Sequence, residues 1–227
     1  TESLDFKNYK NAVDRINVIR SYINSIIMSG STVFLVLLFG GMASYVLARF
    51  EFKFKKIIRN ILAIGLLIPA FVTVVPVYEI LIKLDLVNTY LALILPHTAG
   101  NLIFAILILS TYMASLSKEV EEAAILDGAS RWQIFIRIFV PMSRPAFATV
   151  GIFTFLWSFN DLFLALVYVN QKTVRPIVAL LNAVTSQYGT DYGLHATAVV
   201  VTVIPVLIVY LILQENIVKG LTAGAYR

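Results

Sequence analysis

The sequence contains no cysteine, which excludes a disulfide framework and a thiolate metal site. Only two of its 227 residues are histidine, too few for a histidine-based metal cluster. Charge is also scarce, since 14% of the residues are charged against about 25% in ordinary soluble domains. Hydrophobic residues instead make up 59% of the chain. This composition predicts a protein embedded in a lipid bilayer.

Short motifs of several enzyme classes are absent as well. No GxxxxGK[ST] loop occurs, so the chain does not bind ATP by that means, and neither HExxH nor GxSxG is present. The net charge of +5 comes from basic residues beside apolar runs, a pattern typical of membrane proteins rather than of nucleic-acid binders. We therefore expect no catalytic residues, no metal, no cofactor bound by this chain and no nucleic-acid partner.

Five apolar runs dominate the sequence, and each is long enough to cross a hydrocarbon core of about 30 Å as a helix. In lipid the backbone must satisfy its own hydrogen bonds, which favours helices. The sequence thus predicts an all-α integral membrane protein with five transmembrane helices in contact with membrane lipid. The runs cover residues 23–48, 57–80, 91–113, 146–169 and 196–213.

Lysine and arginine are distributed unevenly among the segments between these runs. Eleven lie on the side that holds residues 49–59, 114–145 and the C-terminal tail, and seven lie on the other side. The excess places residues 114–145 and the C-terminus in the cytoplasm. With five spans, residue 1 then lies outside without an export signal. We expect a further N-terminal span in the full-length protein, which the length of the gene product tests.

The polar segment between the third and fourth runs carries helix start and stop signals. Ser117 is a candidate N-cap, and Gly128 is suited to the left-handed conformation that ends a helix. Ser130 is placed to cap a second helix, which Pro141 and Pro145 are expected to end. The segment therefore predicts a short helix, a sharp turn and a second short helix near the membrane surface.

Small side chains lie close together on the first of these helices. Ala124 and Gly128 share a face, Ala123 lies beside them, and Glu122 and Asp127 flank this surface. Such a face lets another protein approach the backbone closely, while the two carboxylates can pair with basic groups. A solvated amphipathic loop remains the alternative for this segment taken alone.

Two pairs of polar residues inside apolar runs are candidate functional positions. Asn160 and Asp161 lie in the fourth run, where an acid is costly and usually faces a cavity or a partner. They fit a pore or gate position and a hydrogen-bonded packing contact about equally. His97 and Asn101 share a face after Pro96. They fit a pathway position or an interhelical hydrogen bond.

Several motifs together resemble one family. Glu122-Ala123-Ala124 is followed by three residues and Gly128, then by nine residues, Ile138 and Pro141, a spacing similar to the EAA loop of ABC importer permeases. The stretches VLARF, LVNTYL and FLWSFNDLF are also similar to family motifs. Over nearly its whole length the chain resembles the maltose-type second permease of carbohydrate ABC importers.

Two departures from the family pattern stand out. Val140 replaces the usual leucine before the loop's proline, and Ser158 and Phe159 separate Trp157 from Asn160. The resemblance nevertheless implies a type I ABC importer permease bundle, with six spans in the full-length protein. It implies one transmembrane domain over residues 1–227, with a cytoplasmic coupling loop at about 114–145 and a cytoplasmic tail at 215–227.

The resemblance also implies partners and site residues. These partners are a second permease, a dimer of ATPase subunits that carries ATP and Mg, an extracytoplasmic sugar-binding protein and a carbohydrate substrate, in a bacterial cytoplasmic membrane. The ATPase-coupling residues would be Glu122, Ala123, Ala124, Asp127 and Gly128. The pathway residues would be Asn160, Asp161, Trp157, His97 and Asn101.

Two other functions fit an apolar chain of this kind. An ion-coupled secondary transporter would use Asp161 as its coupling acid, although no clear internal repeat supports that class. An intramembrane enzyme would need a metal cluster or a nucleophile–base pair, and neither is evident in the sequence. The permease hypothesis accounts for more of the sequence than either.

Overall fold

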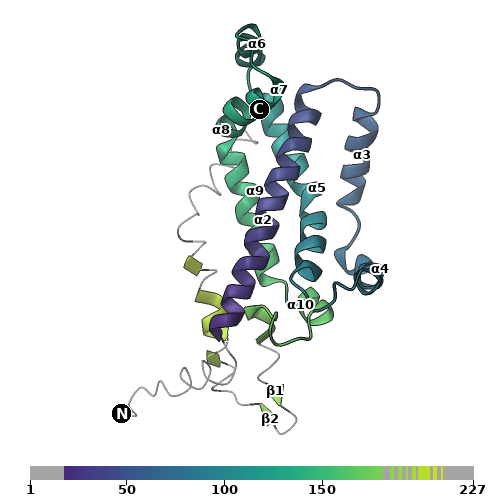
Figure 1. Cartoon of the computed structure of the whole chain (residues 1–227), viewed down its shortest axis with the longest axis vertical. Coiled ribbons are helices and arrows are strands. Elements are labelled where there is room, and N and C mark those ends of the chain that lie inside the picture. The colour runs from purple at the N-terminus through teal and green to yellow at the C-terminus, as the bar shows by residue number, and fades with distance from the viewer. Residues whose placement is uncertain are drawn as a thin grey trace. The chain divides into compact units, whose positions relative to one another are not determined.

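The computed structural model describes residues 18–180 continuously (Figure 1). Beyond them it describes residues 185–186, 189–190, 193, 196–197, 199–204, 207–208 and 211. The helices are α2 (Val18–Arg49), α3 (Lys55–Gly65), α4 (Ala70–Lys83), α5 (Leu91–Ser115), α6 (Lys118–Leu126), α7 (Arg131–Ile134), the π-helical η1 (Phe135–Phe139), α8 (Val140–Met142), α9 (Arg144–Asn160), α10 (Leu162–Tyr168) and the 3₁₀-helical η2 (Ile177–Ala179).

Two of the predicted spans are single long helices. α2 has 32 residues and α5 has 25, and both are apolar enough to cross a membrane. The second run is instead divided into α3 and α4, which meet at an angle of 101°. Counting each bent helix pair as one crossing, the described residues hold up to four spans. The fifth run, at 196–213, lies partly outside the described residues.

Prolines mark some of these irregularities. Pro69 directly precedes α4 at the bend, where its ring removes a backbone donor and disfavours helical geometry in the preceding residue. Pro76 and Pro96 lie inside α4 and α5 without ending them. The fourth run is interrupted differently, because α9 ends at Asn160 and α10 begins at Leu162.

The chain divides into two compact units, and α2, α4, α5 and α9 each contribute to both. One unit contains residues 32–73 and 97–155. Its buried core joins three helices, with Val36 from α2, Ala105 and Leu109 from α5, and Ala146 and Val150 from α9. Small residues permit this close packing.

The other unit contains residues 18–31, 74–96 and the chain from residue 156 onward. Here the non-helical chain after α10 is held by the buried side chain of Asn24. The Asn24 Nδ2 donates to the carbonyls of Thr173 and Arg175 at 3.1 and 3.0 Å, and its Oδ1 accepts from the Tyr90 hydroxyl at 2.7 Å. The nitrogen and the oxygen of the Asn24 side-chain amide are thus both hydrogen-bonded within the protein.

The all-α expectation holds for the main elements, with one small exception. β1 (Thr185–Ser186) and β2 (Gly189–Thr190) form an antiparallel pair. Two residues per strand make this a local feature of a loop, and not a sheet layer.

Candidate coupling segment

Helix α6 begins and ends at the residues that the sequence predicts. The Ser117 hydroxyl accepts a hydrogen bond of 3.1 Å from a backbone N–H of the first turn. After the last turn, Gly128 has a φ of +80°, a conformation that glycine adopts at little cost. The N–H groups of Gly128 and Ala129 donate to the carbonyls of Ile125 and Ala124 at 3.0 and 2.9 Å. This is a Schellman motif, which satisfies the final carbonyls of the helix.

The second helix also begins where expected. The Ser130 hydroxyl accepts from the Gln133 N–H at 3.3 Å, and the Gln133 side chain accepts from the Ser130 N–H at 2.8 Å, a reciprocal capping box. The second helix ends between the two prolines, as predicted, because the helical run that begins at Arg131 ends at Met142 and α9 begins at Arg144. Pro141 lies within α8 after the π-helical η1, and Pro145 lies in the first turn of α9, where a missing N–H removes no helical bond. The chain bends by 77° between Met142 and Arg144.

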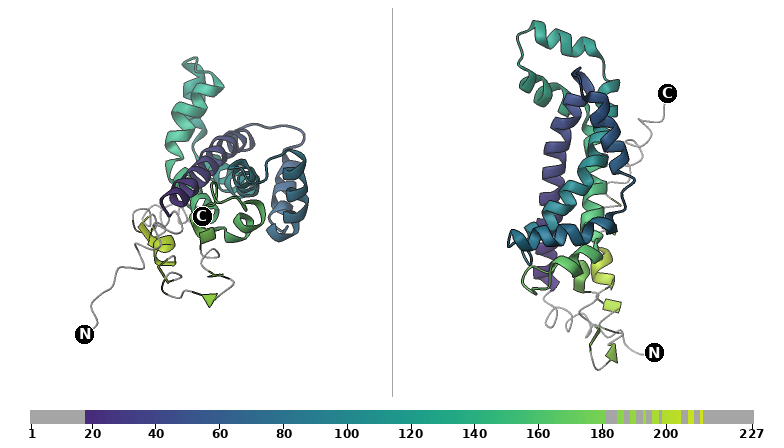
Figure 2. Two further views of the ribbon diagram at one scale, coloured as in Figure 1. Left: turned by 60° about the horizontal axis from the view of Figure 1, so that its bottom comes forward. Right: turned by 90° about the vertical axis from the view of Figure 1, so that its right-hand side faces the viewer.

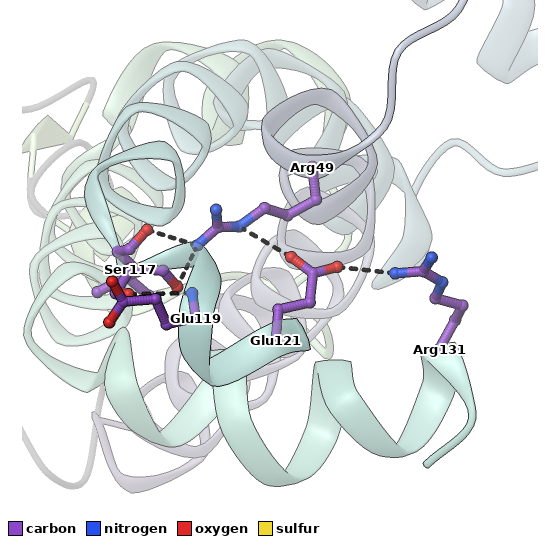
Figure 3. Close-up of polar contacts among 6 residues, drawn as sticks. Arg49, Ser117, Glu119, Glu121 and Arg131 are labelled. Atoms are coloured by element: carbon purple, nitrogen blue, oxygen red, sulfur yellow. Dashed lines mark hydrogen bonds and ion pairs between the residues drawn. The ribbon is translucent and has the colours of Figure 1, made fainter. Parts of the chain in front are cut away.

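A buried carboxylate, Glu121, lies between two arginines (Figure 3). Glu121 is 8% exposed, its Oε2 lies 3.5 Å from the Arg49 Nε, and its Oε1 accepts from the Arg131 Nη1 at 2.8 Å. Arg49 ends α2 and Arg131 begins α7, so one side chain connects α6 to two other helices. The sequence predicts a role for its neighbour Glu122 and not for Glu121, because local spacing does not reveal the tertiary partner of a carboxylate.

Arg49 makes further contacts in the same place. Its Nη2 donates to the Leu116 carbonyl at 2.7 Å and reaches the Ser117 carbonyl at 3.4 Å. Its guanidinium carbon lies 4.6 Å from the centre of the Phe139 ring, within the range of a cation–π contact. The Arg49 side chain is 3% exposed. This residue therefore touches the α5–α6 linker, α6 and η1 at once.

An apolar cluster surrounds these charges. Its buried members are Tyr45 of α2, Met113 of α5, Ile134 of α7, and Phe135 and Phe139 of η1. Figures 1 and 2 show α6 and α7 at the end of the unit where α2 and α5 terminate. The segment is thus fixed at its inner side by aromatic packing and ion pairs.

The predicted coupling residues do not all lie on the same side of α6. Glu122, Ala123, Asp127 and Gly128 are exposed. Ala124 is half-buried and packs against the apolar cluster of α2, α5, α7 and η1. On the outer side a large apolar residue is also exposed, since Leu126 has 88% of its surface accessible. This combination of carboxylates, small residues and an exposed leucine is suited to contact with another protein.

Asn160 and Asp161 lie together at the break between α9 and α10. The Asn160 Nδ2 donates to the Leu156 carbonyl at 2.8 Å, and the Asp161 carboxylate accepts from the Leu164 N–H at 2.9 Å. Asp161 is thus the N-cap of α10, which gives a structural reason for an acid within this run.

The remaining predicted pathway residues lie elsewhere. His97 and Asn101 are buried on consecutive turns of α5, where the Asn101 Nδ2 donates to the His97 carbonyl at 2.7 Å. This bond lies within one helix. Trp157, on α9, is 47% exposed. No group of three or more potential metal ligands gathers in the part of the chain that the structure describes.

Comparison with known proteins identifies the family. The family model described as "Binding-protein-dependent transport system inner membrane component" matches residues 37–223. The diacetylchitobiose uptake system permease protein NgcG of Streptomyces coelicolor is 39% identical over 98% of this chain and 74% of its own length. The probable ABC transporter permease protein YurM of Bacillus subtilis is 35% identical over 91% of this chain and 69% of its own length.

Solved structures show the same fold. A chain of a bacterial ABC transporter that imports the acidic polysaccharide alginate aligns with a TM-score of 0.79 at 23% identity, over 93% of this chain and 79% of that one. A chain of the MetNI methionine ABC transporter aligns with a TM-score of 0.68 at 16% identity, over 89% of this chain and 95% of that one. The chain has the type I ABC importer permease fold, and it belongs to the family of binding-protein-dependent transport system inner membrane components as a multi-pass ABC permease, distinct from the ATPase.

Proposed function

We propose that this permease imports a carbohydrate. Support comes from the names of its relatives, which include permeases for diacetylchitobiose, for melibiose, raffinose and stachyose, and for arabinooligosaccharides. The fold is also shared with an alginate transporter. These substrates range from disaccharides to a polysaccharide, so the proposal extends to the class of sugar and not to one member.

The assembly that we propose contains three kinds of partner. A second permease completes the pore, two ATPase subunits bind and hydrolyse ATP with Mg, and an extracytoplasmic binding protein delivers the sugar. A structure of the alginate transporter in complex with a pentasaccharide-bound periplasmic protein supports the last of these. Closure of the ATPase dimer then moves the permeases between two states as rigid bodies.

The observation that carries this proposal is the exposed outer side of α6. Glu122, Ala123, Asp127 and Gly128 are accessible there, while the inner side of the helix is fixed by Glu121. We propose this outer side as the ATPase-docking surface, with Ala124 supporting it from within. The surrounding coupling loop extends over about residues 114–145, and the tail at 215–227, a second candidate contact, lies outside the described residues.

The proposed transport pathway rests on helix breaks and on buried polar residues. Five crossings over one domain of residues 1–227 accommodate the described helices and the partly described fifth run. Asn160, Asp161 and Trp157 are proposed as pathway positions because they lie at or near a helix break. Half-helix ends inside a membrane commonly serve binding. His97 and Asn101 are proposed as separate pathway positions on α5.

A substitution at Gly128 tests ATPase docking. An added side chain here meets nothing within 4 Å in this chain, so Gly128→Asp projects a charged group outward from the turn. We expect it to abolish co-purification of the ATPase from detergent-solubilised membranes. Gly128→Ala is the matched control, because alanine carries a positive-φ penalty of about 1–2 kcal/mol, at least as large as that of aspartate, without the charge or the bulk.

The expected result is loss of the ATPase with aspartate and its retention with alanine, both permeases remaining at wild-type levels in the membrane. Sugar uptake that persists in the Gly128→Asp variant and collapses when the proton gradient is removed would contradict the proposal in favour of ion coupling.

A further inference from the structure

We infer that Arg49 is a positioning residue whose contact with Glu121 transmits movement of α6 to the membrane helix α2. This inference rests on the proposed docking of an ATPase to α6. It concerns how a displacement of α6 by the ATPase reaches the other helices of the permease. Arg49 and Glu121 both lie outside the proposed docking surface.

Few side chains of α6 pack against the rest of its unit. Glu121 is the one buried residue of this nine-residue helix, and Ala124 adds a half-buried contact. The outer residues Glu122, Ala123 and Leu126 are exposed. A partner seated on the outer side would therefore act on the unit chiefly through the inner side, where Glu121 meets Arg49.

Arg49 is positioned to transmit a displacement of α6 to α2. It is the last residue of α2, a 32-residue candidate span, so its backbone moves with that helix. Its guanidinium pairs with Glu121, donates to the Leu116 carbonyl and lies over Phe139. The planar guanidinium can hold these contacts together, whereas a lysine ammonium offers a single charged point.

The two arginines on Glu121 differ in environment. The Arg49 side chain is 3% exposed, whereas the Arg131 side chain is 56% exposed. An exposed ion pair is screened by water and contributes little. Removing Arg49 leaves Glu121 paired with the exposed Arg131 alone, and loss of one partner of a buried pair is strongly disruptive. The buried contact should therefore govern the position of α6, although the bond to Arg131 is shorter.

The experiment compares these two contacts of the same carboxylate. The full complex of both permeases and the ATPase is purified in lipid nanodiscs with Arg49→Gln, Arg49→Lys or the matched control Arg131→Gln. ATP hydrolysis is measured per assembled complex, with ATP and Mg added and no binding protein or sugar present. In the wild type, closure of the ATPase dimer must also move the permease helices through the contact between Arg49 and Glu121. This mechanical load slows ATP hydrolysis.

We expect both Arg49 variants to hydrolyse ATP about tenfold faster per complex, the scale of a typical coupling free energy. Arg131→Gln should stay within about twofold of the wild type, as expected for an exposed pair. A purely structural role for Arg49 would lower the yield of complex and leave the rate per complex unchanged. Arg49→Lys keeps the positive charge. If Arg49→Gln does not fold, the Arg49→Lys variant still tests the inference.

The failures of the two proposals are distinguishable. Absence of the ATPase from the wild-type preparation would overturn the docking proposal and this inference with it. Retention of the ATPase in every variant, with equal rates per complex, would overturn this inference alone. Equal acceleration by Arg131→Gln and Arg49→Gln would likewise overturn it, because the buried contact would then have no special role.

Discussion

The role of Asp161, a carboxylate inside an apolar run, can be tested by substitutions that separate its charge from its capping hydrogen bond. Asp161 accepts the Leu164 N–H and caps α10, a task that an asparagine side chain performs about as well. Asp161→Ala should lower the free energy of unfolding by about 1 kcal/mol, whereas Asp161→Asn should leave it nearly unchanged. Thermal unfolding of the detergent-purified protein measures both effects.

The same pair of variants separates two modes of transport. If ATP drives the permease, Asp161→Asn retains uptake, since the cap survives and no titrating group is needed. Loss of uptake in the stable asparagine variant would instead point to an ionisable group in the pathway and to ion coupling.

Local signals at the residue scale were predictable from sequence. Ser117, Gly128 and Ser130 were each identified as helix ends, because a cap or a positive-φ turn depends on residues within one turn of the chain. Glu121 was missed because its partner Arg49 is distant in sequence, and only folding brings the two together.

Helix packing requires a small residue at Gly40 of α2 but not at Gly30. A Cβ added at Gly40 would lie 3.0 Å from the Cβ of Ala105, whereas a Cβ at Gly30 would meet nothing within 4 Å. Gly40→Ala should therefore destabilise the protein by about 1–3 kcal/mol through overpacking. Gly30→Ala should be neutral or stabilising by up to about 1 kcal/mol, because alanine favours helix.

The measurement is thermal unfolding of both variants in the same detergent. Since the two substitutions are chemically identical and lie on one helix, their difference reports the approach of α5 alone. Equal unfolding temperatures would show that α2 and α5 can separate at Gly40 without cost.

At the scale of whole helices, hydropathy predicts which residues are helical but not the angles between consecutive helices. α2 and α5 match the first and third predicted spans. The second run was predicted as one span, and its division into α3 and α4 was not. A run of apolar residues indicates that a segment tolerates lipid, but it does not fix where the helices within that run change direction.

For the whole molecule, the predicted orientation is testable because the chain has no native cysteine. Leu126→Cys on α6 and Lys172→Cys after α10 both place a thiol at an exposed site. The charge distribution predicts that a membrane-impermeant maleimide labels Cys at position 172 in spheroplasts and Cys at position 126 only in inside-out vesicles. The reverse pattern would place α6 on the outer side and remove the basis for ATPase docking.

The bend between α3 and α4 constrains the lipid around the protein. Residues 66–69 lie between two helices within an apolar run, and all four are exposed in the single chain. Acyl chains offer no hydrogen bonds, so irregular backbone at membrane depth is tolerated only beside protein or water. If α3 and α4 form one crossing, the annulus of lipid must be interrupted at this bend.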